Sequence, residues 1–113
     1  MRWFLRSKIH KATVTGEDLN YVGSIGIDKA LIQKVGILAG EKVLVVDNSN
    51  GARLETYVIE EKEKSGKIIM YGAASHLVKK DDEIIIMGFE LADKPVKVRN
   101  ILVDKNNKFV RLL

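Results

Sequence analysis

The sequence predicts a mainly β protein that folds as one small closed barrel with short helices. Its length of 113 residues is the usual size of one domain, and its apolar share of 46% supplies one modest core. Six or more short strand patterns follow one another with only two short helical patterns between them, which favours a barrel over a sandwich or a parallel sheet. We therefore expect residues 1–113 to form a single β-barrel domain.

A strand and a helix are expected in the first third of the chain. Residues 7–15 are rich in β-branched side chains and predict a strand, and residues 16–18 predict the turn after it. A short helix is expected at Lys29–Val35, because Asp28 can cap its start and Gly36 can end it. The apolar stripe of this helix indicates a structural role.

Strand patterns separated by turn formers dominate the rest of the chain. Residues 47–51 are dense in turn formers and predict a hairpin between the strands on either side. Residues 60–67 are charged and predict an exposed loop, whereas residues 72–78 predict a helical turn. The expected strands are 42–46, 53–59, 68–71, 83–89, 96–103 and 108–112.

The composition excludes several classes of site and of protein. The absence of cysteine excludes a disulfide framework, thiolate metal sites and cysteine nucleophiles. His10 and His76 lack a metal-ligand spacing, so we expect no metal. The apolar run within residues 1–6 is too short for a signal peptide, and the run at 84–89 is too short to span a bilayer. We expect a cytoplasmic protein without a membrane partner.

The positive charge of the chain is concentrated at its C-terminal end. Residues 92–113 hold six Lys or Arg against two Asp, which accounts for the whole net charge of +4. Only Phe109 interrupts this segment as an aromatic residue, a poor match to a surface on which nucleic-acid bases stack. A solvated surface is the favoured interpretation, and a basic β-barrel that binds nucleic acid remains an alternative.

One dipeptide, Gly23-Ser24, draws attention because of its neighbours. It is the only Gly-Ser pair of the chain, and strand-like residues flank it. Alone it indicates a turn. Together with four other blocks, it gives the chain a pattern that resembles the pyruvoyl-dependent aspartate decarboxylases. The blocks are 7–10, 12–15, 18–24, 50–57 and 72–78.

The resemblance implies a fold, an assembly and a cofactor. The fold would be a six-stranded double-psi β-barrel, assembled as a homotetramer with active sites between neighbouring subunits. The Ser24 hydroxyl would attack the Gly23 carbonyl and cut the chain into a β subunit, 1–23, and an α subunit, 24–113. The serine would become a pyruvoyl group, which replaces pyridoxal phosphate or a metal as the cofactor. Cleavage can be spontaneous or assisted by a maturation factor, and both routes remain open.

The same resemblance implies a role for each residue of the site. Thr56 would orient the Gly23 carbonyl during processing. Arg53 and Lys8 would bind the two carboxylates of L-aspartate, and Tyr57 would return a proton after decarboxylation. The substrate would also contact Gly72, Ala73 and Ala74, whereas His10 and Tyr21 would lie near the processing site with less defined roles. The product would be β-alanine, for pantothenate and coenzyme A synthesis.

Two features depart from this simple pattern. Strict alternation places Arg53 and Tyr57 on one face of a strand and Thr56 on the other, so a bend or twist is expected if all three serve one site. Tyr71 occupies a position where the family usually has asparagine, which leaves open another acidic substrate such as glutamate.

Overall fold

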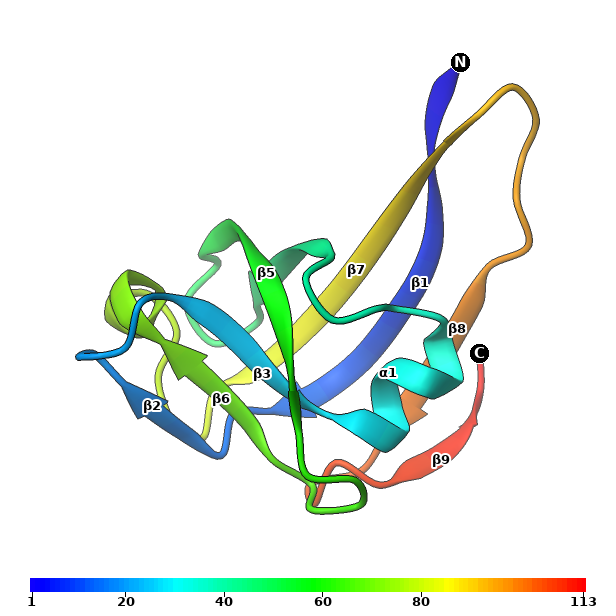
Figure 1. Ribbon diagram of the computed structural model, residues 1–113. Helices are drawn as coiled ribbons and strands as arrows, with labels where there is room; N and C mark the ends of the chain where they lie inside the picture. The colour runs from blue at the N-terminus through cyan, green and yellow to red at the C-terminus, as the bar shows by residue number, and fades with distance from the viewer.

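The computed structural model describes all 113 residues as a mainly β structure with one short α-helix (Figure 1). The strands are β1 (Arg2–Thr13), β2 (Gly16–Asp18), β3 (Ser24–Asp28), β4 (Lys42–Asp47), β5 (Arg53–Glu61), β6 (Ile68–Tyr71), β7 (Glu83–Ala92), β8 (Arg99–Val103) and β9 (Phe109–Leu112). The helices are α1 (Lys29–Val35) and the 3-10 helix η1 (Gly72–His76). As predicted, the Asp28 side chain accepts a hydrogen bond from the Ala30 amide at 2.8 Å, and Gly36 ends the helix with a φ of 75°.

The strands form one sheet in the order β2-β6-β3-β5-β4-β7-β1-β8-β9. Three pairs are parallel, namely β1 with β8, β2 with β6 and β3 with β5, and the remaining pairs are antiparallel. The prediction of a closed six-stranded barrel is not confirmed, because the sheet has nine strands and its end strands, β2 and β9, each have only one neighbour.

Several element boundaries differ from the sequence prediction. Strand β1 begins at Arg2 rather than at residue 7, because its first residues pair with the far end of β7 from Arg2↔Ala92 onward. Residues 16–18, predicted as a turn, pair with β6 as strand β2. Strand β5 continues to Glu61, into the predicted loop, and β8 begins at Arg99 rather than at residue 96.

A hydrophobic core of 19 buried residues lies against one face of the sheet. On β4, Val43 and Val45 belong to this core, whereas Leu44 and Val46 point to the opposite face and are half-buried. The ends of β1 and β7 leave the body as a two-stranded ribbon (Figure 1), and the molecule measures 40 × 27 × 25 Å. No helix is both long enough and apolar enough to cross a membrane.

Candidate functional site

The backbone is strained at Gly23 and Ser24, where strand β3 begins. Gly23 has a φ of 120°, which glycine tolerates because it lacks a Cβ. Ser24 has a φ of 127°, a region that side chains rarely adopt and that costs on the order of 1–3 kcal/mol. Strain of this kind concentrates at functional sites when the surrounding structure holds it in place. The peptide bond between the two residues therefore stands out from the rest of the backbone.

The Ser24 hydroxyl is buried and has no hydrogen-bond partner. The residue is 1% exposed, and its Oγ is one of four buried side-chain atoms in the chain without a partner. An unsatisfied buried hydroxyl costs about 1–3 kcal/mol, so folded proteins rarely keep one without a reason. An oxygen free of hydrogen bonds beside a strained carbonyl is suited to nucleophilic attack.

A pocket of about 300 Å³ opens beside this strained peptide and gathers much of the predicted site. Its lining consists mainly of small or apolar residues from four segments of the chain. The lining residues are Val22, Gly23, Ser24, Leu54, Glu55, Thr56, Tyr71, Ala73, Ala74 and Leu77. The structure thus brings Ser24 together with Thr56 and with the predicted substrate contacts Ala73 and Ala74.

Gly72 lies directly behind the segment that precedes Ser24. A Cβ at this position would lie 2.8 Å from both N and Cα of Gly23 and 2.9 Å from the Tyr21 carbonyl oxygen. Gly72 also has a φ of 68°. Only glycine permits this close backbone approach.

The Tyr71 side chain is held by two contacts, one at its hydroxyl and one at its ring. Its hydroxyl donates a hydrogen bond to Glu61 Oε2 at 2.8 Å, and the centroid of its ring lies 4.7 Å from the centroid of the Tyr21 ring. Burial, followed by the hydrogen bond and the negative charge of Glu61, raises the pKa of Tyr71 to about 12. The sequence does not point to Glu61, because the charged residues 60–67 predict an exposed loop.

Arg53 and Tyr57 do not share the pocket with Ser24. The alternation of exposed and covered residues along β5 is regular from Arg53 to Val58, so these two side chains lie on the opposite face from Thr56. Tyr57 lines a second, adjoining pocket together with Lys42, Glu55 and Thr56.

Lys8 and His10 lie on β1, away from the pocket. Lys8 pairs with Met87, which pairs with Leu44, which in turn pairs with Glu55 beside Thr56. Three strand spacings therefore separate Lys8 from β5 along the sheet, a path of roughly 14 Å. The pKa of His10 is lowered by burial and by the positive charges of Lys8 and Lys11, and its Nδ1 has no partner. His76 is exposed.

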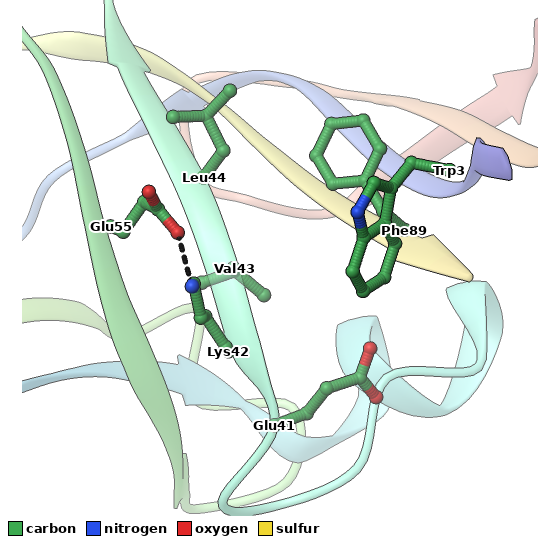
Figure 2. Close-up of a pocket in the computed structure, with 7 residues that line it drawn as sticks. All are labelled: Trp3, Glu41, Lys42, Val43, Leu44, Glu55 and Phe89. Carbon is green, nitrogen blue, oxygen red and sulfur yellow. Dashed lines mark ion pairs between the residues drawn. The ribbon is translucent and has the colours of Figure 1, made fainter. Parts of the chain in front are cut away.

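A larger groove of about 560 Å³ lies on the outer face of the sheet and contains none of the predicted site residues. Figure 2 shows its lining: Trp3, Glu41, Lys42, Val43, Leu44, Glu55 and Phe89. The Trp3 and Phe89 rings stand together on the β1–β7 ribbon, and Lys42 forms a 2.7 Å ion pair with Glu55. The exposed apolar rings of this groove indicate a surface that contacts another protein rather than a site for a dicarboxylate.

Comparison with known proteins connects this geometry to one family. A model of the family described as aspartate decarboxylase matches residues 1–110. The aspartate 1-decarboxylase of Clostridium botulinum strain Alaska E43 is 54% identical over 107 residues, which cover 91% of this chain and 86% of that protein. The enzyme of that name from Caldicellulosiruptor saccharolyticus is 50% identical (96% and 88% covered), and that from Thermotoga petrophila is 45% identical (96% and 95% covered). The chain belongs to the aspartate decarboxylase family.

Proposed function

We propose that this protein is an aspartate 1-decarboxylase precursor that cleaves itself between Gly23 and Ser24. The mature enzyme would convert L-aspartate to β-alanine and carbon dioxide, and so supply pantothenate and coenzyme A synthesis. The observation that carries the proposal is the buried, unpartnered Ser24 Oγ beside a backbone strained on both sides of one peptide bond. The relatives share the activity in their names and cover nearly the whole chain.

The cleavage is an attack of Ser24 Oγ on the carbonyl carbon of Gly23. The C–N bond breaks as the C–O bond forms, and the nitrogen takes up a proton to become the free amine of an ester. Loss of the Ser24 α-proton then breaks the Cβ–Oγ bond, which leaves a Gly23 carboxylate and a dehydroalanine. Water adds to the dehydroalanine and ammonia leaves, so that a pyruvoyl group heads the fragment 24–113. Thr56, in the same pocket, would donate a hydrogen bond to the carbonyl oxygen as negative charge develops on it.

The residues around Ser24 fit a pyruvoyl group. Small and apolar neighbours, Ala73, Ala74 and Leu54, would leave room for a group no larger than the serine and would exclude water from it. The group would supply a ketone that accepts the electrons released with carbon dioxide. Tyr57, in the adjoining pocket, would return the proton to carbon.

The mature enzyme would be a homotetramer in which neighbouring subunits complete each active site. Within one chain Lys8 lies three strands away from β5 along the sheet, and it lines neither the pocket beside Ser24 nor the adjoining one. A second copy that covers the outer sheet face could bring its own Lys8 to the site, and Arg53 already lies on that face. We further propose that the chain adopts a double-psi barrel, a reading supported by its interleaved parallel pairs β3 with β5 and β1 with β8.

The denatured mass of the purified protein tests the proposal directly. We expect two pieces, residues 1–23 and 24–113, of which the larger lacks a free amino terminus. Ser24→Ala should give one intact, inactive chain, whereas Ser65→Ala in the exposed loop serves as a control and should be cleaved normally. Fully active protein that keeps an ordinary serine at this position would contradict the proposal.

Glutamate is the second candidate substrate, because Tyr71 replaces the asparagine usual in the family and lines the pocket. Assays of purified enzyme with each amino acid, with β-alanine and γ-aminobutyrate as the measured products, separate the two.

A further inference from the structure

The segment 19–23, just before the proposed cleavage site, has few contacts of its own. Leu19 is 53% exposed, Tyr21 49% and Val22 91%. Outside the regular elements, no backbone–backbone hydrogen bond involves any of residues 19–23. A segment with so few contacts would ordinarily sample many conformations. Gly23 nevertheless has to present its carbonyl to Ser24 in one orientation.

The dipeptide Tyr71-Gly72 supplies the contacts that the segment lacks. Ser24 pairs with Tyr71 in the antiparallel ladder of β3 and β6. The Tyr21 ring packs on the Tyr71 ring at 4.7 Å with an interplanar angle of 47°, and the Gly23 backbone passes directly over Gly72. Tyr21 and Gly23, just before the cleavage site, and the serine itself therefore lie along one short stretch of β6 and η1.

Glu61 fixes the other side of Tyr71. Its Oε2 accepts the Tyr71 hydroxyl at 2.8 Å, and its carboxylate lies so close over Gly26 that a Cβ at Gly26 would collide with it. Because β5 pairs with β3 at Asp28↔Glu61, Glu61 belongs to the rigid sheet. The phenol of Tyr71 stays protonated at neutral pH, since its pKa is about 12, so the hydrogen bond to Glu61 persists.

We propose that Glu61, Tyr71 and Tyr21 form a clamp that holds the segment before the Gly23–Ser24 bond in the conformation required for self-cleavage. The three side chains are positioning residues, since none of them lies at the reacting atoms. The clamp acts on the precursor, and it explains how a carboxylate on β5 can influence a bond at the start of β3. The effect of the clamp on cleavage rests on the proposed self-cleavage, whereas its effect on the conformation of the segment does not.

The first arm of the test measures the clamp without cleavage. In full-length Ser24→Ala protein, the backbone order parameters of Val22 and Gly23 should lie near ~0.85, the value of a rigid backbone. Tyr71→Ala or Tyr21→Ala in this background should lower them below ~0.6, whereas Tyr21→Phe, which keeps the ring, should leave them unchanged. Order parameters that stay high in both alanine variants would overturn the clamp, whatever the enzyme does.

The second arm measures its consequence in chains that retain Ser24. Precursor is made by cell-free synthesis, and the fraction cleaved is followed over time by intact mass. We expect Tyr71→Ala and Tyr21→Ala to slow cleavage about tenfold, as the loss of an aromatic pair and its buried area implies. Glu61→Ala should slow it about threefold, and Glu61→Gln, which keeps an acceptor oxygen, should restore a rate within about twofold of the unmodified chain.

Together, the two arms distinguish a failure of the clamp from a failure of the proposed self-cleavage. An unmodified chain that is never cleaved, either alone or with a cell extract that can supply a maturation factor, would contradict the proposed function, while the order parameters would still decide the clamp. Normal cleavage rates in Tyr71→Ala, Tyr21→Ala and Glu61→Ala would overturn the clamp and leave the proposed function intact.

Discussion

The pocket around Ser24 and the outer sheet face around Trp3 differ in how much one chain can complete. In the pocket, Ser24, Gly23, Thr56 and Gly72 already lie together in a single copy. On the outer face, Trp3 is 69% exposed and its neighbours leave an apolar groove without a partner in the chain. The difference suggests that self-cleavage is an event within one chain, whereas substrate binding depends on a second copy.

The largest expected effect is that of Gly72→Ala on cleavage. The new Cβ would lie 2.8 Å from the Gly23 backbone and would displace the scissile carbonyl. A displacement of about 1 Å can cost about 100-fold in rate, so intact mass over time should show a loss of at least that size. Gly40→Ala is the matched control, because Gly40 also has a positive φ of 85° but would meet nothing within 4 Å. Equal cleavage in the two variants would show that close approach at Gly72 is unimportant.

The Lys8→Ala variant should impair substrate binding without impairing self-cleavage. We expect normal cleavage but a KM for L-aspartate raised about 10- to 100-fold, the size of one lost charge-assisted hydrogen bond. Lys62→Ala, an exposed lysine in the loop after β5, is the control and should leave KM unchanged.

Mixed oligomers test whether the two regions come from different subunits. At L-aspartate concentrations well below the raised KM of Lys8→Ala, the Lys8→Ala and Tyr57→Phe chains are each expected to be nearly inactive alone. Coexpressed, they should regain activity in about a quarter of the sites if one subunit supplies Lys8 and its neighbour supplies Tyr57. No recovery would place both residues of a site in the same chain.

Trp3→Asp should weaken the oligomer with little effect on the fold of each chain, because Trp3 is 69% exposed and outside the core. Light scattering after size exclusion should show smaller species at equal protein concentration. Leu38→Asp is the control, since Leu38 is 73% exposed but does not line the groove. A tetramer that survives Trp3→Asp unchanged would direct attention to another face.

The smallest expected effect concerns stability at alkaline pH. Tyr71 has a pKa of about 12 in the folded chain, above its ordinary value of 10.0, so unfolding makes its hydroxyl easier to ionise. Its contribution to stability is therefore present below pH 10 and is lost as the pH rises toward 12. Chemical denaturation of Ser24→Ala protein between pH 9 and pH 12 should show a steeper loss than for Ser24→Ala with Tyr71→Phe. Parallel curves would contradict the raised pKa.

Local pattern was sufficient where neighbours in the sequence are also neighbours in space. The helix Lys29–Val35, with its cap Asp28 and its terminal Gly36, follows from residues within one helical turn of each other. The family blocks identified Ser24 and Thr56, and the structure places both in one pocket. The alternation of β5 from Arg53 to Val58 also followed from the sequence.

Tertiary structure alone decided the features that depend on pairing between distant segments. Residues 16–18 become a strand only because β6, some fifty residues later, offers its edge, and β1 starts early only because β7 extends alongside it. The clamp of Glu61, Tyr71 and Tyr21 likewise cannot be predicted from the sequence. Its members come close together only because strands β3, β5 and β6 pair with one another. The amino-acid sequence determined which residues are chemically able to act, because side-chain chemistry is local. Their distances and burial were decided by the fold, because pairing and packing depend on residues far apart in the chain.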